Sequence, residues 1–451
     1  MTECSQETFS FTAHFSRRVE AGFSAGRVST DGGVLLLREV EGKIHLQGRL
    51  VGCFIDGRSP FRVKHQLSEM LAQRIYGLAL GYEDLNDHEQ LRSDPLLSLL
   101  SGKRDLEEPL AGKSTLNRLE LAGRSARYHK IDYSPSGIDR LLGDLYIESH
   151  SVPPSQIVLD LDATDIPLYG HQPERFFHGY YGSYCYLPLY IFAGDQLLCA
   201  RLRAANQDAA AGSLEELKPI VEQLRKRWPA VDIVLRADSG FCREELMVWC
   251  EANRVDYAFG LARNQRLGKI IGAQMHQAHL QHQTTGKPAR VFAEFSYQTR
   301  KSWSCARRVV GKAEYLDKGE NPRFVVTSLT AQRWPAQDLY EKFYCARGEM
   351  GVSSQGHINQ SVKVRPRLTD SSLVAWEASW SESETMRPSD NMLRKEYAQL
   401  TRLQRAVNAD VASSPEHPEA ETVHNARKQQ EPIRNESDTT ALSGGVSAAT
   451  W

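Results

Sequence analysis

The segment IVLDLDATD (157–165) constrains the fold of this chain most strongly, because it joins a strand-like run to crowded acids. Its first three residues are apolar, as in a buried strand. Alternate residues of a strand project from the same face, so Asp160 and Asp162 project together, with Asp165 close behind. Crowded carboxylates repel one another unless a cation or a shared proton relieves them. A strand that ends in an Asx turn explains the same residues, and this simpler interpretation stays open.

A second segment, IVLRADSGF (233–241), repeats this pattern: an apolar strand runs into Asp238, and Ser239 and Gly240 follow. If the two strands are neighbours in a mixed sheet, the carboxylates of Asp162 and Asp238 converge. Mg²⁺ and Mn²⁺ prefer oxygen ligands in octahedral array. The two segments therefore predict a site for a divalent cation between the two strand ends.

Residues 151–263 alternate between strand and helix patterns, which predicts an α/β fold. Tyr184–Phe192 and Gln196–Leu202 flank a Gly194-Asp195 turn and predict an antiparallel hairpin. The remaining expected elements are strands at Val231–Asp238 and Val255–Leu261 and helices at Ala209–Arg227 and Arg243–Ala252. Pro219 is expected to kink or break the first of these helices.

Residues 1–150 predict a mainly helical domain, through which we expect the chain to bind DNA. Apolar residues recur at three- and four-residue spacings between Pro60 and Gly81, as in an amphipathic helix. Shorter helices are expected at Val34–Val40, Leu85–Leu91, Leu96–Leu100 and Leu116–Leu121.

Residues 264–330 predict a β-rich insertion, and a helix is expected over Ala336–Met350. The strands are expected at Val291–Gln298, Trp303–Val310 and Arg323–Leu329. Basic residues, including Lys301 and Arg308, are interleaved with aromatic ones, a mixture that suits a nucleic-acid surface. An exposed sheet whose charges prevent aggregation explains the same composition.

Global properties point to no particular partner. The net charge is −1, so a DNA surface has to come from local clustering of basic residues. No two of the eight cysteines form a CxxC pair, which argues against a structural zinc site and fits a reducing cytoplasm. The N-terminus lacks the features of a secretory leader, and no apolar run reaches the ~18 residues of a membrane span.

Four stretches resemble the DDE transposases of bacterial insertion sequences, over roughly residues 20–350. They are DLDATD (160–165), GYYGSYCYLPLYIF (179–192), LRADSGF (235–241) and YCARGEM (344–350). The last one resembles the start of a family signature in which a Tyr is followed after two residues by Arg and after three more by Glu. The β-rich segment resembles the insertion that some of these enzymes carry before the third acid.

The resemblance implies an RNase H-like mixed sheet flanked by helices and a two-metal enzyme that cuts and joins DNA at transposon ends. It makes Asp162 and Asp238 the first two catalytic residues and ligands of Mg²⁺ or Mn²⁺, with Asp160 and Asp165 as supporting neighbours. Tyr344, Arg347, Lys301 and Arg308 are the expected DNA contacts. The implied partners are terminal inverted repeats and target DNA, bound by a homodimer in the cytoplasm at the nucleoid.

The signature places the third acid at position 351, which is glycine. On a regular α-helix, positions 344, 347 and 351 share one face, and Glu349 lies about 200° away from 351. From Gly351 onward the sequence stops resembling the family, so we expect a reading-frame change near codon 351, impaired cleavage, and a low-order tail over 352–451. One helix is expected in that tail, over Asn391–Val407.

Two other functions stay open. A catalytically dead relative would still bind DNA and occupy transposon ends. An RNase H-like nuclease would use the same acids in a different reaction. Preference for inverted-repeat ends, together with strand joining, distinguishes a transposase from both.

Overall fold

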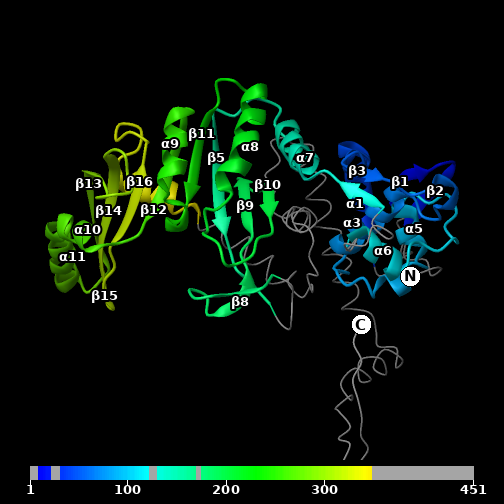
Figure 1. The fold of residues 1–451 in the computed structure, drawn as a ribbon, viewed down its shortest axis with the longest axis horizontal. Helices are drawn as coiled ribbons and strands as arrows, with labels where there is room; N and C mark the ends of the chain where they lie inside the picture. Colours follow the sequence, from blue (N-terminus) through cyan, green and yellow to red (C-terminus); the bar gives the residue numbers. More distant parts are fainter. Residues whose placement is uncertain (1–8, 22–30, 121–129, 169–173, 348–451) are drawn as a thin grey trace, which may run out of the picture. The chain divides into compact units, whose positions relative to one another are not determined.

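The computed structural model describes residues 9–21, 31–120, 130–168 and 174–347 (Figure 1). The tail over 352–451, its expected helix and position 351 lie outside these ranges. No helix of the described residues is long and apolar enough to cross a membrane.

The N-terminal region is mainly helical, as predicted, but it also contains two small antiparallel strand pairs. Strand β1 (Phe9–His14) pairs with β2 (Arg17–Ala21), and β3 (Phe54–Asp56) pairs with β4 (Ile131–Tyr133). The helices are α1 (Val34–Ile44), α2 (Leu46–Val51), the short 3-10 helix η1 (Pro60–Arg62), α3 (Leu67–Ala79), α4 (His88–Leu91), α5 (Pro95–Leu100), α6 (Lys113–Glu120) and α7 (Pro135–Glu148).

A mixed sheet forms the second part, with the strand order β10-β9-β5-β11-β12-β16-β14-β13. Strand β5 (Gln156–Ala163) is parallel to β11 (Asp232–Ala237), which is parallel to β12 (Val255–Leu261). Strands β9 (Leu189–Ala193) and β10 (Gln196–Arg201) form the predicted antiparallel hairpin. The fold is therefore mixed α/β.

The strand predicted over Tyr184–Phe192 is wrong in its length, because two strands occupy it. Strand β8 (Ser183–Tyr186) joins β6 (Ile166–Pro167) and β7 (Phe176–His178) in a separate small sheet, and β9 begins at Leu189. Pro188 separates the two strands, and proline has no N–H to donate to a sheet.

The β-rich segment after residue 264 continues the main sheet. Strands β13 (Ala289–Tyr297), β14 (Arg307–Leu316) and β16 (Arg323–Thr327) extend it beyond β12, and β15 (Gly319–Glu320) pairs with β14. The strand expected from Trp303 begins only at Arg307. The reason is a turn in which the Thr299 hydroxyl accepts from the Trp303 N–H at 2.8 Å.

One face of the sheet carries the main core. Helices α8 (Ser213–Arg227) and α9 (Glu244–Ala252) lie beside the central strands, and α10 (Gln265–Ile270) and α11 (Gly272–Thr285) lie beside β13 and β14 (Figure 1). Pro219 lies within α8 without interrupting it. Helices α10 and α11 were not predicted from the sequence. Odd-numbered residues of β5, such as Leu159 and Leu161, point into this core and are fully buried.

The opposite face receives the even-numbered residues, including Val158 and Asp160 on β5. It is covered by α12 (Ala336–Asp338) and η3 (Leu339–Tyr344), where Leu339, Tyr340 and Phe343 pack on Val234 of β11. The regular α-helix expected over Ala336–Met350 is wrong for Leu339–Tyr344, because η3 is a π-helix. The last three residues of the expected helix, 348–350, lie outside the described ranges. Its wider turn is closed by the Cys345 N–H donating to the Tyr340 carbonyl at 2.9 Å.

Candidate active site

The two aspartates predicted from the strand pattern follow neighbouring strands. Asp160 is in register with Arg236, and Leu161 with Ala237, so Asp162 comes beside Asp238, the residue directly after β11. The expectation that the two strands are neighbours is confirmed, and they pair in parallel. Asp238 also caps the short 3-10 helix η2 (Ser239–Phe241), since its carboxylate accepts from the Gly240 N–H at 2.8 Å.

Asp162 lies in surroundings that disfavour its charge. Burial raises the pKa of its carboxyl above 3.8, and the charge of Asp238 raises it further. The Thr164 hydroxyl, which donates to Asp162 at 2.6 Å, and the positive charge of Arg347 act in the opposite direction. The two carboxylates therefore interact electrostatically across the strand ends.

Asp160, expected as a supporting neighbour, is held in a buried ion pair. Its two oxygens accept from Nε and Nη2 of Arg236 at 2.6 and 2.7 Å. Burial raises the pKa of Asp160, and Arg236 opposes that rise. The remaining Arg236 nitrogen, Nη1, donates to the Phe343 carbonyl at 2.6 Å. Arg236 thus connects β5, β11 and the C-terminal cover next to the two aspartates.

Arg236 was not predicted as a site residue, although a signal for it is present in the sequence. A strand residue two positions before Asp238 projects from the same face, and this face needs a positive charge because it carries the acids. Thr164 and Tyr181 were missed as well. Tyr181 reaches the site from a distant turn, which local periodicity does not reveal. Its hydroxyl donates to the Ala163 carbonyl at 3.4 Å.

The C-terminal cover brings Tyr344 and Arg347 to the aspartates. The positive charge of Arg347 acts on Asp160 and Asp162, and its guanidinium lies 5.9 Å from the centre of the Tyr344 ring. Burial raises the pKa of Tyr344, with Asp238 adding to the rise. The Tyr344 hydroxyl lies so close to Gly260 that a Cβ at position 260 would be 2.6 Å from it.

Two basic residues of the β13–β14 region have different surroundings. Lys301 is exposed in the connection between these strands, as a DNA contact requires. Arg308 is engaged within the fold: it donates to the Leu329 and Trp334 carbonyls at 2.7 and 2.8 Å and pairs with Glu294 at 2.8 Å. These contacts argue against the DNA-binding role expected of Arg308, because both of its terminal nitrogens already donate within the fold and its Nε is buried.

The donor chemistry of the aspartate pair suits a hard cation. Carboxylate oxygens are the ligands that Mg²⁺ and Mn²⁺ prefer, and a cation would relieve the repulsion by which Asp238 raises the pKa of Asp162. The described part of the chain contains no group of three or more His, Cys, Asp or Glu side chains suited to a metal. The residues present thus supply two carboxylates whose oxygens suit a hard cation.

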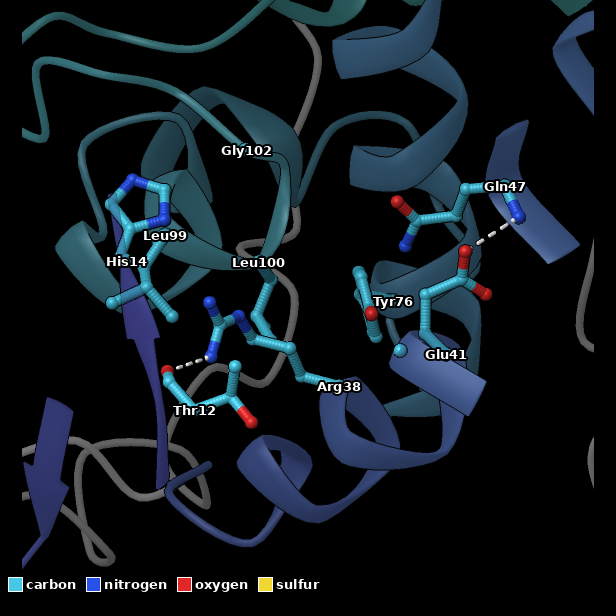
Figure 2. Close-up of a pocket in the computed structure, with 10 residues that line it drawn as sticks. Thr12, His14, Arg38, Glu41, Gln47, Tyr76, Leu99, Leu100 and Gly102 are labelled. Atoms are coloured by element: carbon cyan, nitrogen blue, oxygen red, sulfur yellow. Dashed lines mark hydrogen bonds between the residues drawn. The ribbon is translucent and has the colours of Figure 1, made fainter. Parts of the chain in front are cut away.

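A cavity of about 220 Å³ lies elsewhere, in the helical N-terminal region (Figure 2). Its charged side chains are engaged in hydrogen bonds within the fold. Arg38 donates to the Thr12 carbonyl at 2.7 Å, and Glu41 accepts from the backbone N–H groups of Leu46 and Gln47. Burial is the main cause of the raised pKa of Glu41. None of the residues predicted for the active site lines this cavity.

Fold and site together define an α/β protein with paired carboxylates at the carboxyl ends of adjacent parallel strands. The chain belongs to the DDE transposases: the family model described as "Transposase DDE domain group 1" matches residues 11–353. This match supports a general role in DNA transposition, in a family that generally uses divalent metal ions.

The chain is also similar to solved structures, among them a transposase complex. The cryo-EM structure of a piggyBac transposase synaptic complex with hairpin DNA is 11% identical to this chain, with a TM-score of 0.38. The alignment covers 89% of this chain and 87% of that one. No curated protein matches the chain.

Proposed function

We propose that Asp162 and Asp238 are the first two catalytic acids of a transposase that cleaves insertion-sequence ends and transfers the strand. The observation that carries this proposal is the pair of acids at the ends of β5 and β11, where one charge acts on the other. The implied partners are the terminal inverted repeats and target DNA, bound by a homodimer at the nucleoid. The mixed sheet with its flanking helices supports an RNase H-like core.

The chain's own residues have distinct tasks in this proposal. Asp162 and Asp238 would hold the cation, and Thr164 fixes the orientation of the Asp162 carboxylate. When bound, divalent ions activate the attacking oxygen and offset charge on the scissile phosphate. Arg347 and Tyr344 would contact the DNA backbone, because Arg donors suit phosphate oxygens. Arg236 holds the cover in position through the Phe343 carbonyl.

We further propose that cleavage is impaired. In the family signature, the acid that follows Tyr344 and Arg347 falls at position 351, which is glycine here. The family match ends at residue 353, close to that position, which supports a change of reading frame. Two aspartates give too few anionic ligands to anchor two cations well. This favours a second candidate function, in which the chain occupies transposon ends without cutting them.

The test is cleavage of a duplex that carries the ends of the element encoding this chain, with Mg²⁺ or Mn²⁺. We expect the unaltered chain to bind this duplex and cut it poorly. Gly351→Glu should increase cutting if the following residues support the acid. Adding Asp238→Ala to Gly351→Glu should lower the rate by about 1,000-fold, since metal-stabilised charge is worth several kcal/mol.

Asp232→Ala is the matched control, since Asp232 lies at the other end of β11 and is exposed. It should leave cutting unchanged. Robust cutting by the unaltered chain that Asp238→Ala abolishes would show that the third acid comes from elsewhere. Cutting that survives Asp238→Ala would refute the site itself. Failure to bind the duplex would refute both candidate functions.

A further inference from the structure

Exposed aromatic side chains gather on the hairpin formed by β7 and β8. Phe177 is 58% exposed, Tyr184 is 47% exposed, and Tyr180 at the tip is 87% exposed. Exposed apolar residues scattered singly are ordinary, but a contiguous group marks a binding surface. We call Arg175, Phe177, Tyr180 and Tyr184 the aromatic platform.

The platform has a defined geometry. Phe177 and Tyr184 are directly opposite each other on the two antiparallel strands, and their rings lie 5.6 Å apart, edge to face. The guanidinium of Arg175 lies 4.7 Å from the centre of the Tyr184 ring. Cross-strand partners share one face of a sheet, so these side chains form one surface.

The tip of the hairpin links the platform to the aspartates. Gly182, with φ of +67°, turns the chain between β7 and β8 and accommodates a conformation that other residues rarely adopt. The ring of Tyr180 lies 5.0 Å from that of Tyr181, whose hydroxyl reaches the Ala163 carbonyl at the end of β5.

The charges of the active-site acids also act on Tyr181. Burial, followed by the charges of Asp165, Asp162 and Asp238, raises the pKa of Tyr181 to about 12. Its hydroxyl therefore stays protonated at neutral pH and can donate to the Ala163 carbonyl. Tyr180 of the aromatic platform thus lies next to a residue that contacts the end of β5, beside the site that we propose for the scissile phosphate.

We propose that the aromatic platform stacks unpaired bases of the DNA strand that enters the Asp162–Asp238 site. This inference rests on the proposed function and specifies the state of its DNA substrate. Stacking on exposed rings requires an accessible base face, and bases inside a duplex have both faces covered. Arg175, whose guanidinium lies over the Tyr184 ring, adds a positive charge to the aromatic rings, a combination that suits single-stranded nucleic acid.

The experiment compares two duplexes of equal length and sequence on the full chain, without divalent cation. One is fully paired, and the other contains a short internal loop of unpaired bases that includes 2-aminopurine. Base–aromatic stacking is worth ~1–3 kcal/mol per base, so we expect the looped duplex to bind about tenfold more tightly. Its 2-aminopurine fluorescence should be quenched on binding.

The variant that tests the platform is Phe177→Leu with Tyr184→Leu, which keeps apolar volume and removes both rings. It should abolish the preference for the looped duplex and the quenching. Tyr184→Phe keeps the ring and should retain both. Phe61→Leu is the matched control, since Phe61 is 100% exposed on η1. Circular dichroism melting confirms that each variant is folded.

The outcomes separate this inference from the proposed function. Equal binding of both duplexes, or a preference that survives the double variant, would overturn the platform and leave transposon-end binding intact. No binding of either duplex would overturn the platform together with DNA binding. A double variant that changes the sedimentation mass and keeps the preference would show that the aromatic rings join copies of the chain.

Discussion

At the scale of single residues, burial and the charge of Asp238 make the ionised form of Asp162 unfavourable. The pKa of Asp162 lies above its ordinary value of 3.8, so the folded chain binds a proton there more tightly than the unfolded chain does. The contribution of this group to stability is fully present below pH 3.8 and is lost as the pH rises through the raised pKa. At neutral pH the charge of Asp162 therefore destabilises the fold.

Because the charge of Asp162 destabilises the fold at neutral pH, we predict that Asp162→Asn stabilises it there. The amide oxygen can still accept from the Thr164 hydroxyl, and the charge facing Asp238 is gone. We expect a higher melting temperature at neutral pH, by about 2–4 °C for each kcal/mol of relieved repulsion. The gain should vanish below pH 3.8, where the carboxyl is protonated in both states. Thermal melts at both pH values measure this.

Asp232→Asn is the control for that measurement, because Asp232 is exposed at the start of β11. It loses only an exposed ion pair with Arg333, worth at most about 1 kcal/mol, so it should not raise the melting temperature at neutral pH. A melting temperature of Asp162→Asn equal to or below that of the unaltered chain at neutral pH would contradict the electrostatic account.

At the scale of elements, the close packing of η3 on the strand ends depends on Gly260. A Cβ there would lie 2.6 Å from the Tyr344 hydroxyl oxygen and 2.9 Å from the Ser239 nitrogen. The second contact is with backbone, which cannot move aside as a flexible side chain can. Gly260 therefore allows β12, the Asp238 turn and Tyr344 to approach one another.

We predict that Gly260→Ala costs about 1–3 kcal/mol of unfolding free energy, the usual penalty for overpacking. Urea denaturation measures this loss. Gly268→Ala is the control: Gly268 lies in α10 with nothing within 4 Å of the added Cβ, so alanine should stabilise by up to about 1 kcal/mol. Equal effects of the two substitutions would show that the approach of Tyr344 to Gly260 is not tight.

At the scale of the whole molecule, one arginine joins the last N-terminal helix to the sheet. Arg201 at the end of β10 donates to Asp139 of α7 at 2.9 Å and to Glu216 of α8 at 2.9 Å. The three side chains are only 18–22% exposed. Removing one member of such a cluster leaves charges partly buried without their partner, which is costly.

We predict that Arg201→Met lowers the unfolding free energy by about 3 kcal/mol. Arg333→Met is the matched control, because Arg333 pairs with Asp232 at 3.0 Å in a largely exposed bridge. An exposed pair of this kind is worth at most about 1 kcal/mol. Urea denaturation of both variants gives the comparison, and losses of the same size would contradict a special role for the buried cluster.

Much of the active site was predictable because its signals are local. Asp162 and Asp238 each follow an apolar strand, and the hairpin of β9 and β10 follows from a Gly-Asp turn between two strands. Arg308 could not be placed in the same way. Its charge and its aromatic neighbours suggested a DNA surface. In the structure, its terminal nitrogens donate to the carbonyls of Leu329 and Trp334, which are distant in sequence.

The sequence by itself determined the central strands β5, β11 and β12, the helices α8 and α9, and which strands end in acids, because periodicity and turn residues act over a few positions. Only the tertiary structure decided that β13, β14 and β16 extend the main sheet. It likewise decided that residues 339–344 form a π-helix and that Tyr181 lies beside the aspartates. These features depend on pairing and packing between residues far apart in the chain, and local pattern carries no information about such partners.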